Sequence, residues 1–332
     1  MSTFLIIHHY TNQPRIHPYA THVITINQGA SAGAIYHQLQ SYSVLPDSWL
    51  MRTWFKLKTS QNTLKAGDYQ FPSPITPRQV YEKLVQGDVV KRFVTIPEGL
   101  NRFEIVAIIE KLGLASSESL LELTSDPKLL NLIKDLDPAA TDLEGYLYPD
   151  TYQYTANSTP EQLLTMMVKR FRQVFSPAFI ERANQLKMSV REVVTLASMI
   201  EREAKLDEER AIISSVYHNR LQKGIKLDCD PTVIYAAILA QKWTGVIRRS
   251  DLQRRSPYNT YLTPGLPPGP IASPGKKSIE AALFPADTPY LYFVVNAEAN
   301  NGSHLFTDNF VNHQANVALY RTSQQKKVNH QR

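Results

Sequence analysis

One acidic side chain lies where general acid catalysis would place it. The run from Ser189 to Ala204 has the spacing of an amphipathic helix. Its apolar face would consist of Val190, Val193, Val194, Ala197, Ile200 and Ala204. Glu201 falls inside this stripe, and apolar neighbours disfavour a carboxylate and raise its pKa, which suits a general acid. The alternative is structural: an acid on an apolar face can also pair with an arginine or cap a neighbouring helix.

Glu203 lies two residues beyond Glu201 in the same run. Two residues correspond to roughly 200° around a helix, so Glu203 is expected to face elsewhere.

Further polar residues follow this helix. A second helix is predicted for residues 208–223, where Arg220 lies one turn after Val216 and could reach inward to a carboxylate. Alternatively, Arg220 and Asn219 are only solvent-exposed polar residues at the end of the helix. Asp228 and Asp230 would share one face of an extended segment, as a second catalytic carboxylate or a cation site. Because Pro231 follows, the stronger interpretation makes Asp230 the N-cap of a helix over residues 231–241.

A long stretch rich in proline and glycine, residues 252–275, contains aromatic and amide side chains. Loops of this length without regular structure usually carry function. Sugars bind by stacking on aromatic rings with hydrogen-bonding groups around the rim, although such a loop can also be a rigid connector. The residues considered for a sugar-binding groove are Asp150, Tyr152, Tyr258 and Tyr261.

The elements that must position these residues read as a mixed α+β fold. Residues 22–90 alternate short strands and helices, with a helix expected to begin at Thr76-Pro77. A strand over residues 91–96 precedes helices near 102–112 and 118–123, and residues 160–221 are strongly helical. Ser189 and Glu192 form a capping-box pair at the start of the candidate helix. Residues 290–295 read as the clearest buried strand.

Composition limits the kinds of partner and cofactor. The 332 residues carry 36 basic and 30 acidic side chains, a net charge of +6. This excess favours an anionic partner such as cell-wall polymer, membrane headgroups or nucleic acid. However, no dense basic block with interleaved aromatic residues is present, which argues against nucleic acid. The single Cys229 excludes an intrachain disulfide and a thiolate cluster, and only His8 and His9 are closely spaced, so no metal or cofactor is expected.

The chain opens with only four consecutive apolar residues, Phe4–Ile7, where a membrane span needs about 20. It also lacks the basic leader and long apolar core of a signal peptide. We therefore expect either a cytosolic protein or one whose export and anchoring segment is missing from this version of the chain.

Several ordered motifs carry a family resemblance. They are Thr-Ile-Pro-Glu-Gly (95–99), Leu-Glu-Gly-Tyr-Leu-Tyr-Pro-Asp-Thr-Tyr (143–152), Ala-Ser-Met-Ile-Glu-Arg-Glu (197–203), Val-Tyr-His-Asn-Arg-Leu (216–221), Asp-Pro-Thr-Val-Ile-Tyr (230–235), Ser-Pro-Tyr-Asn-Thr-Tyr (256–261), Gly-Leu-Pro-Pro-Gly-Pro-Ile (265–271) and Gly-Ser-His-Leu-Phe (302–306). With these motifs, residues 22–321 resemble the endolytic murein (lytic) transglycosylases of the YceG/MltG type.

The resemblance implies a domain order. Residues 1–21 would be an N-terminal remnant lacking the usual membrane helix, and 22–90 a LysM-like peptidoglycan-binding module. Residues 91–325 would form the larger, helix-rich catalytic domain, with 91–150 as a connecting subdomain and 326–332 as a tail. It further implies a place at the inner membrane facing the periplasm, peptidoglycan glycan strands as the substrate, and wall-synthesis enzymes at the membrane as candidate partners.

The resemblance also implies a reaction and a site. The catalytic acid, taken as the first acid of the 197–203 motif, falls on Glu201. It would cleave the β-1,4 bond between N-acetylmuramic acid and N-acetylglucosamine within glycan strands, leaving 1,6-anhydro ends. Candidate substrate-binding residues are Asp150, Tyr152, Asn219, Arg220, Asp230, Tyr258, Asn259, Thr260 and Tyr261. Two alternatives stay open: a hydrolytic muramidase that uses Asp228 or Asp230 with Glu201, and a wall-binding scaffold without activity.

Two further departures from the family pattern are visible. The family tends to have Gln-Ser-Asp-Pro where this chain has Asp228-Cys229-Asp230-Pro231. Near the end, Asn312-His313-Gln314 replaces Glu-His-Asn, which leaves a polar role there open.

Overall fold

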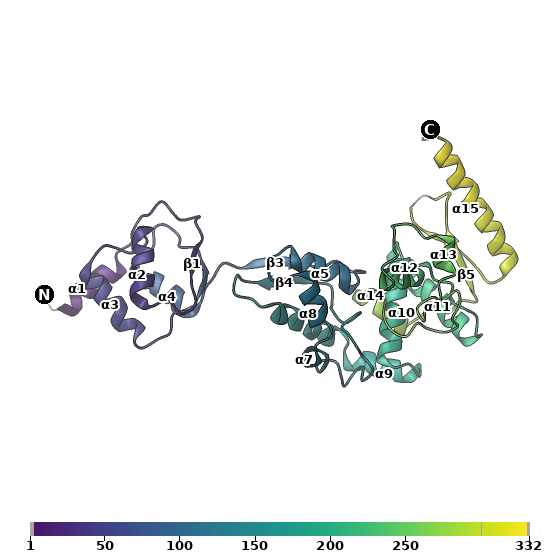
Figure 1. Cartoon of the computed structure of the whole chain (residues 1–332), viewed down its shortest axis with the longest axis horizontal. Coiled ribbons are helices and arrows are strands. Elements are labelled where there is room, and N and C mark those ends of the chain that lie inside the picture. The colour runs from purple at the N-terminus through teal and green to yellow at the C-terminus, as the bar shows by residue number, and fades with distance from the viewer. Residues whose placement is uncertain (1–2, 300, 331–332) are drawn as a thin grey trace. The chain divides into compact units, whose positions relative to one another are not determined.

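A computed structural model describes residues 3–299 and 301–330, and the chain divides into two compact units (Figure 1). Unit 1 comprises the chain up to Val94 together with Gln153–Thr159, and unit 2 comprises Thr95–Tyr152 and the chain from Pro160 onward. The described fold belongs to the α+β class, with many helices and three two-stranded sheets. None of its described helices is both long and apolar enough to cross a membrane.

In unit 1, a two-stranded antiparallel sheet has two helices between its strands. Strand β1 (Ile24–Ile26) pairs with β2 (Gly67–Tyr69), and the intervening helices are α2 (Ala32–Ser41) and α3 (Trp49–Thr59). Helix α4 (Pro77–Gln86) follows. Each of the three helices begins with a side-chain cap, from Ser31, Ser48 and Thr76 respectively. Ile24, Leu39, Phe55 and Leu84 are among the buried residues of one core.

The residues before the predicted module belong structurally to unit 1. Helix α1 (Thr3–Asn12) contacts both α3 and α4. Beyond it, the backbones of Arg15 and Ile75 exchange two hydrogen bonds. The segment expected as a remnant therefore packs on the module, and the compact unit begins before residue 22.

Unit 2 begins with a small helical region. Strands β3 (Arg92–Thr95) and β4 (Thr151–Tyr154), which pair with each other, lie where the chain passes from one unit to the other. The helices are α5 (Arg102–Glu110), α6 (Ser117–Leu123), α7 (Pro127–Leu130), α8 (Pro160–Val174) and α9 (Pro177–Gln185). Asn101 and Glu104 form a capping box at the start of α5, which fixes the turn after the Thr-Ile-Pro-Glu-Gly motif.

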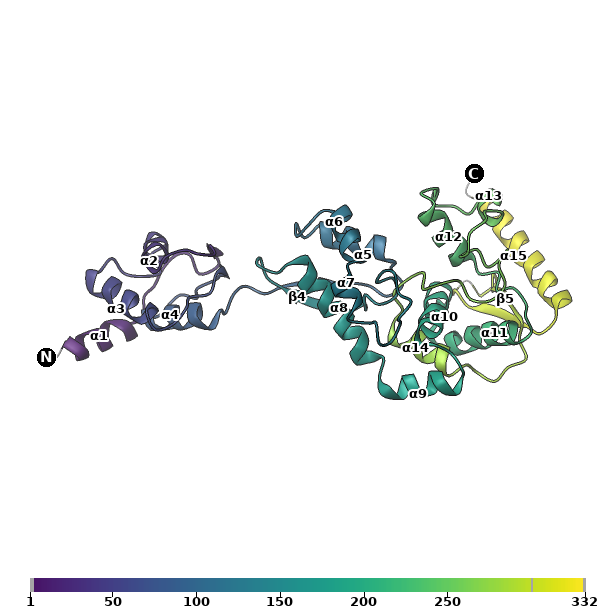
Figure 2. The same ribbon diagram turned by 60° about the horizontal axis from the view of Figure 1, so that its bottom comes forward.

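Helix α10 (Val190–Glu203) is the most enclosed helix of unit 2. Every residue from Val193 to Ile200 is buried, and the predicted Ser189–Glu192 capping box is confirmed. Around it lie α11 (Arg210–Gln222, preceded by the short 3-10 helix η1, Asp207–Glu209), α12 (Asp230–Leu239) and α14 (Lys276–Leu283). The contact with α14 is the most extensive, and both views show these helices side by side (Figure 2).

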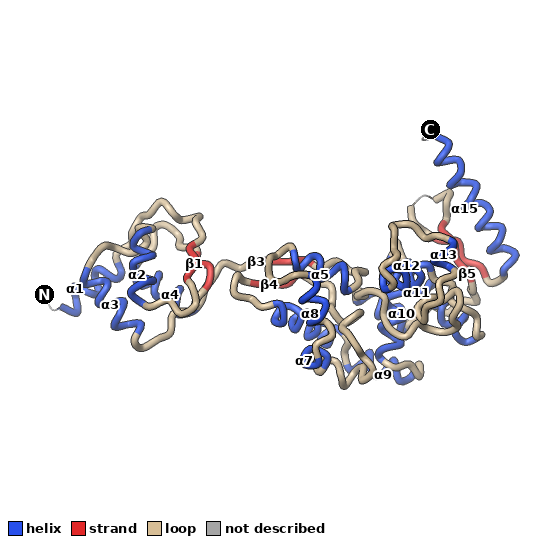
Figure 3. The backbone as a smooth tube through the Cα atoms, in the orientation of Figure 1, coloured by secondary structure: helices blue, strands red, loops and turns tan. Residues whose placement is uncertain are grey.

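Loops make up much of the rest of unit 2 (Figure 3). Between α12 and α14 the chain contains only the short α13 (Arg249–Leu252). The proline-rich segment that follows α13 contacts α10, because the Ile271 N–H donates to Ser198 Oγ at 3.1 Å. Ala272 and Ser273 in the same segment are fully buried. The loop is therefore a packed wall of the domain.

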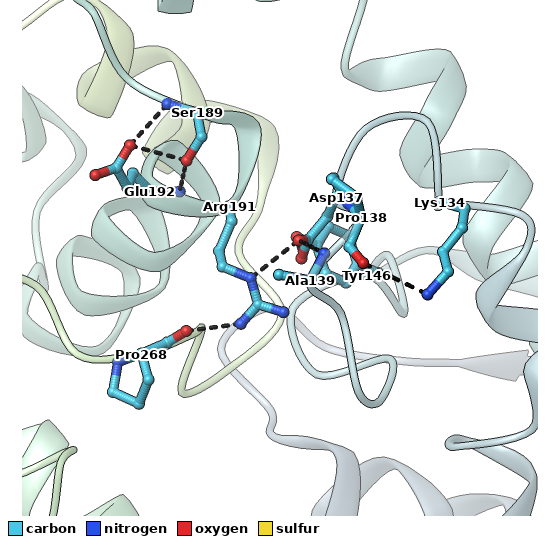
Figure 4. A network of polar contacts seen from close by, with 9 residues as sticks. All are labelled: Lys134, Asp137, Pro138, Ala139, Tyr146, Ser189, Arg191, Glu192 and Pro268. Carbon is cyan, nitrogen blue, oxygen red and sulfur yellow. Dashed lines mark hydrogen bonds and ion pairs between the residues drawn. The ribbon is translucent and has the colours of Figure 1, made fainter.

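A network around Arg191 fastens this wall to α10 (Figure 4). Arg191 donates from Nε to Asp137 Oδ1 at 3.0 Å and from Nη1 to the Pro268 carbonyl at 2.6 Å. Asp137 is 2% exposed and also accepts the Tyr146 hydroxyl at 2.6 Å. One guanidinium thus joins three separate stretches of the chain.

The C-terminal part corrects three expectations. Strand β5 (Tyr292–Val295) pairs antiparallel with β6 (His304–Thr307), but β5 is half-exposed where a buried strand was predicted, since only one small sheet is present there. Helix α15 (Phe310–His330) contacts β5 and includes residues 326–330 of the expected tail, while 331–332 lie outside the described residues. Helix α12 begins at Asp230 itself, with Cys229 as its N-cap residue, so the predicted capping role of Asp230 is wrong.

Candidate active site

The last turn of α10 sends three consecutive side chains to three different surroundings. Glu201 accepts a hydrogen bond from Arg210 Nη1 at 3.1 Å and another from the Gly275 N–H at 2.9 Å. Arg202 donates to the Gly99 carbonyl at 2.9 Å. Glu203 accepts the Cys229 thiol at 3.4 Å. Successive side chains are separated by about 100° on a helix, so each reaches a different neighbour.

Glu201 is held in a charged cluster. Its side chain is 6% exposed and that of Arg210 is 10% exposed, so the ion pair is largely shielded from water. Arg210 also donates to Asp207 at 3.1 Å and to the Ser278 hydroxyl. Pairing with an arginine is the structural alternative that the sequence left open, and the structure contains it. Val193, Val194, Ala197 and Ile200 of the predicted stripe are buried, whereas its ends Val190 and Ala204 are half-buried, and Glu201 lies at the charged end of the helix.

A second carboxylate lies near Glu201. Burial, with the negative charge of Glu201, raises the pKa of Glu98, while Arg210 and Lys277 oppose the rise. A Cβ at position 275, at the start of α14, would overlap the Glu98 carboxylate, so any other residue there would require Glu98 to move. This glycine therefore lets Glu98 and the Gly275 N–H approach the end of α10 together.

Glu203 has a different electrostatic environment. Burial raises the pKa of Glu203 to about 7, and the neighbouring carboxylate of Asp230 adds to the rise, while Cys229 and Arg202 oppose it. A carboxyl group with a pKa near 7 is protonated in a substantial fraction of molecules at neutral pH and can donate a proton. Glu203 thus has the raised pKa that suits a general acid.

Glu203 also lines a cavity of about 500 Å³ in unit 2. Three predicted substrate-binding residues, Arg220, Asp230 and Tyr261, line the same cavity. The remaining lining residues come chiefly from β5, β6 and α15: Leu227, Asp228, Tyr292, Phe293, Val294, Val295, His304, Phe310, His313, Val317, Tyr320 and Arg321. An acid, a hydroxyl group and aromatic rings therefore face one space.

The three predicted residues are fixed in this cavity by their own contacts. The Tyr261 hydroxyl donates to Asp230 Oδ1 at 2.7 Å. Arg220 pairs with Asp228 at 3.0 Å, which agrees with the prediction that it reaches inward to a carboxylate. It also donates to the Leu291 and Leu227 carbonyls. Its guanidinium lies 5.0 Å from the Tyr292 ring centroid. Arg220 thus shapes the cavity wall and the strand beside it.

The other candidates from the same motifs have partners elsewhere. Asn219 donates to the Thr288 and Tyr290 carbonyls. Asn259 is fully buried and donates to three carbonyls of its own loop, and buried Thr260 accepts the Cys229 N–H at 3.0 Å. Tyr258 packs on Tyr235 with ring centroids 5.0 Å apart. None of these four lines the cavity, and their contacts indicate that they support its walls.

Asp150 and Tyr152 also lie outside the cavity lining. Asp150 pairs with Arg170 at 2.7 Å. Burial opposes ionisation there, but the Thr151 N–H and Arg170 together lower the pKa of Asp150. Tyr152 is buried, with its hydroxyl on the Tyr148 carbonyl at 2.6 Å. Across the described ranges, no group of three or more His, Cys, Asp or Glu side chains could hold a metal ion.

Sequence reasoning missed several residues of the cavity. Glu203 was set aside because it faces away from the apolar stripe, yet that direction is where β5, β6 and α15 enclose the cavity. His304 and its buried partner Glu209 come from segments 95 residues apart. The Gly-Ser-His-Leu-Phe motif was the available signal for His304, but nothing in the sequence joined it to Glu209.

An acid of raised pKa in a cavity with hydroxyl and aromatic groups is the arrangement of a site that cleaves glycosidic bonds. The comparisons agree with this class: the chain belongs to the YceG-like family, whose sequence profile matches residues 24–319.

Individual relatives are also similar over most of the chain. An endolytic murein transglycosylase of Bacillus subtilis is 32% identical over 317 residues, covering 92% of this chain and 86% of that protein. One of Streptococcus pneumoniae is 27% identical over 90% of this chain, which spans 58% of that longer protein. The crystal structure of a YceG-like protein from Listeria monocytogenes matches with a TM-score of 0.61 and 31% identity, over 88% of this chain and 97% of that one.

Proposed function

We propose that this protein is an endolytic murein transglycosylase, a lyase that cleaves peptidoglycan glycan strands internally. The names of the Bacillus and Streptococcus relatives support this activity. The observation that carries the proposal is the Glu203 carboxyl group, which has a pKa of about 7 and lines a cavity with Asp230 and Tyr261. The substrate is the β-1,4 bond between N-acetylmuramic acid and N-acetylglucosamine.

We assign the acid to Glu203 and keep Glu201, the acid predicted from the sequence, as the competing candidate. Glu201 does not line the cavity, and its carboxylate accepts hydrogen bonds from Arg210 and from the Gly275 N–H. Glu203 lines the cavity, and burial, with the neighbouring charge of Asp230, raises its pKa so that its proton is retained to higher pH.

The reaction needs one carboxyl group in two roles. Protonated Glu203 gives its proton to the glycosidic oxygen while positive charge develops at the muramic C1. The resulting carboxylate then accepts the proton of the muramic C6 hydroxyl, whose oxygen bonds to C1 and closes the 1,6-anhydro ring. The enzyme regains its proton, and no water is consumed. Proton transfer of this kind contributes roughly 10²–10⁴-fold to the rate.

The cavity supplies the binding part of catalysis. Asp230 and Tyr261 offer a carboxylate and a hydroxyl group beside the acid, and the Tyr292 ring offers an apolar face for a sugar. Asn219, Asn259, Thr260 and Tyr258 act indirectly, because their polar or ring groups hold the loops that form the walls.

Unit 1 is proposed as a LysM-like module that binds peptidoglycan. The antiparallel β1–β2 sheet with α2 and α3 between its strands supports this assignment. Because the substrate is cell-wall polymer, we place the enzyme on the outer side of the cytoplasmic membrane. Wall-synthesis enzymes are its expected partners, since the cleaved strands are their product.

One observation favours a second reaction. Asp230 lies in the same cavity as Glu203, and a pair of carboxyl groups is what a hydrolase uses. The hydrolytic muramidase is therefore the alternative, and its products would carry reducing ends.

Mass spectrometry of purified peptidoglycan digested with wild type, Glu203→Gln and Glu201→Gln tests these assignments. We expect anhydro-muramic products from wild type and from folded Glu201→Gln, and none from Glu203→Gln. Activity in Glu203→Gln with loss in folded Glu201→Gln would return the acid to Glu201. Reducing-end products would establish the hydrolase, and intact strands with retained binding would leave a wall-binding scaffold.

A further inference from the structure

A buried histidine–glutamate pair borders the same cavity as Glu203. His304 is the first residue of β6, and Glu209 is the last residue before α11. The His304 backbone N–H donates to Glu209 Oε1 at 2.8 Å, and His304 Nδ1 lies 2.7 Å from Glu209 Oε2. Their exposed fractions are 8% and 7%. Two contacts to one carboxylate fix both the position and the rotation of the imidazole.

This pairing determines what the other ring nitrogen can do. A carboxylate only accepts hydrogen bonds, so Nδ1 is the donor, and in the neutral ring Nε2 then carries a free lone pair. Among the residues that the structure describes, Nε2 has no hydrogen-bonding partner, and it is not sealed from solvent. The ring also packs against Phe293, with centroids 5.3 Å apart and planes at 87°. His304 lines the cavity, so Nε2 is the ring nitrogen left available to a ligand bound there.

A second histidine shows what a purely structural role looks like. His218 on α11 uses Nε2 to contact the Ala282 carbonyl at 2.9 Å, which ties α11 to the end of α14. It does not line the cavity. His304 differs because the nitrogen with the structural contact is Nδ1, while Nε2 has no hydrogen-bonding partner among the described residues, and the residue lines the cavity.

We infer that His304 is a positioning residue for the glycan: held by Glu209, its Nε2 accepts a hydrogen bond from the muramic C6 hydroxyl. This inference rests on the proposed transglycosylase function, in which that hydroxyl must be aligned on C1. The hydrogen bond orients the oxygen lone pair for attack. Glu203 first gives its proton to the leaving oxygen, and the bond from C1 to that oxygen breaks. The C6 hydroxyl then turns its single hydrogen from His304 Nε2 to the Glu203 carboxylate, the bond from O6 to C1 forms, and the O6 proton passes to Glu203. His304 gains no proton in the overall reaction.

His304→Asn separates the two ring nitrogens. The asparagine amide can still donate to Glu209 in place of Nδ1, but it has no atom at the position of Nε2. We expect anhydro product to form at least tenfold more slowly at saturating glycan, with KM and the thermal midpoint close to those of wild type. His218→Asn, which alters a histidine outside the cavity, should retain the wild-type turnover.

A spectroscopic measurement covers the case in which His304→Asn does not fold. In Glu203→Gln labelled with ¹⁵N at histidine, saturation with purified short glycan strands should shift the Nε2 resonance of His304 and leave that of His218 unchanged. An unmoved His304 resonance, or wild-type turnover in folded His304→Asn, would overturn the inference. Absence of anhydro products from wild type would instead overturn the proposed function, so the two failures are distinguishable.

Discussion

Glu201 and Glu203 lie two residues apart on α10, yet their carboxylates have opposite electrostatic environments. Glu201 faces the guanidinium of Arg210 at 3.1 Å, whereas Glu203 faces the like charge of Asp230 and the Cys229 thiol. The separation of about 200° around the helix axis carries one to the α14 side and the other to the cavity. The two acids of the motif therefore face different partners, and on this difference rests our proposal of proton transfer at Glu203 and a structural role at Glu201.

The pH dependence of the rate should report Glu203. Because the reaction begins from the protonated acid, kcat/KM should be constant below pH 7 and fall above it, by about tenfold per pH unit well above the pKa. The rate of anhydro-product release from purified glycan strands, measured from pH 5 to 9, gives the profile. A rate that stays constant to pH 9 with the fold intact would contradict Glu203 as the acid.

Removing the charge of Asp230 should move that profile. The Asp230 carboxylate helps to raise the pKa of Glu203, so Asp230→Asn should lower this pKa and shift the alkaline limb to lower pH. The asparagine oxygen can still accept the Tyr261 hydroxyl, which preserves the contact. We expect the rate at pH 8 to fall roughly threefold relative to wild type, with a smaller loss at pH 6.

Asp228→Asn is the matched control for this shift. It removes the same charge from the same cavity, but the Asp228 carboxylate is paired with Arg220 and does not contribute to the raised pKa of Glu203. Its alkaline limb should stay close to that of wild type. An equal shift in both variants would show that the general charge of the cavity, and not Asp230, controls the acid.

The local elements of the fold could be predicted because their signals are local. Two helix starts are predicted by residues within one turn of sequence: Ser189 with Glu192, and Thr76 with Pro77. Helices α10 and α4 begin at these positions. The central part of the predicted apolar stripe of α10, from Val193 to Ile200, is likewise buried. Each of these inferences depends on residues within a few positions of one another.

The cavity could not be predicted, because distant segments form it. Which side of α10 meets a cavity depends on β5, β6 and α15, which follow about 90 to 120 residues later in the chain. The role of Asn259 could not be predicted for the same reason. Its motif suggests sugar binding, but its side-chain amide donates to three backbone carbonyls of residues 251–254. The partner of a polar side chain is a tertiary property, and spacing alone does not reveal it.

Glu201 should matter for stability more than for proton transfer. Glu201→Ala leaves the nearly buried Arg210 without its shielded partner, and loss of one member of such a pair costs about 3 kcal/mol of unfolding free energy. Chemical denaturation of wild type and variant measures the difference. Glu82→Ala, which breaks the exposed pair with Arg78, should cost less than about 1 kcal/mol and serves as the control. If both variants lost equally little unfolding free energy, Glu201 would have no structural role.

The Arg191 network should couple the proline-rich wall to the rest of unit 2 (Figure 4). Arg191→Ala would leave Asp137, 2% exposed, with the Tyr146 hydroxyl but no cation, at a cost of about 3 kcal/mol or more. Arg191→Ala/Asp137→Asn should recover part of this loss, because the buried charge is then absent. Chemical denaturation of wild type, Arg191→Ala, Asp137→Asn and the double variant gives the coupling energy between Arg191 and Asp137. Additive losses would mean that Arg191 stabilises the domain only through the Pro268 carbonyl. The Arg191–Asp137 ion pair would then not contribute to holding α10.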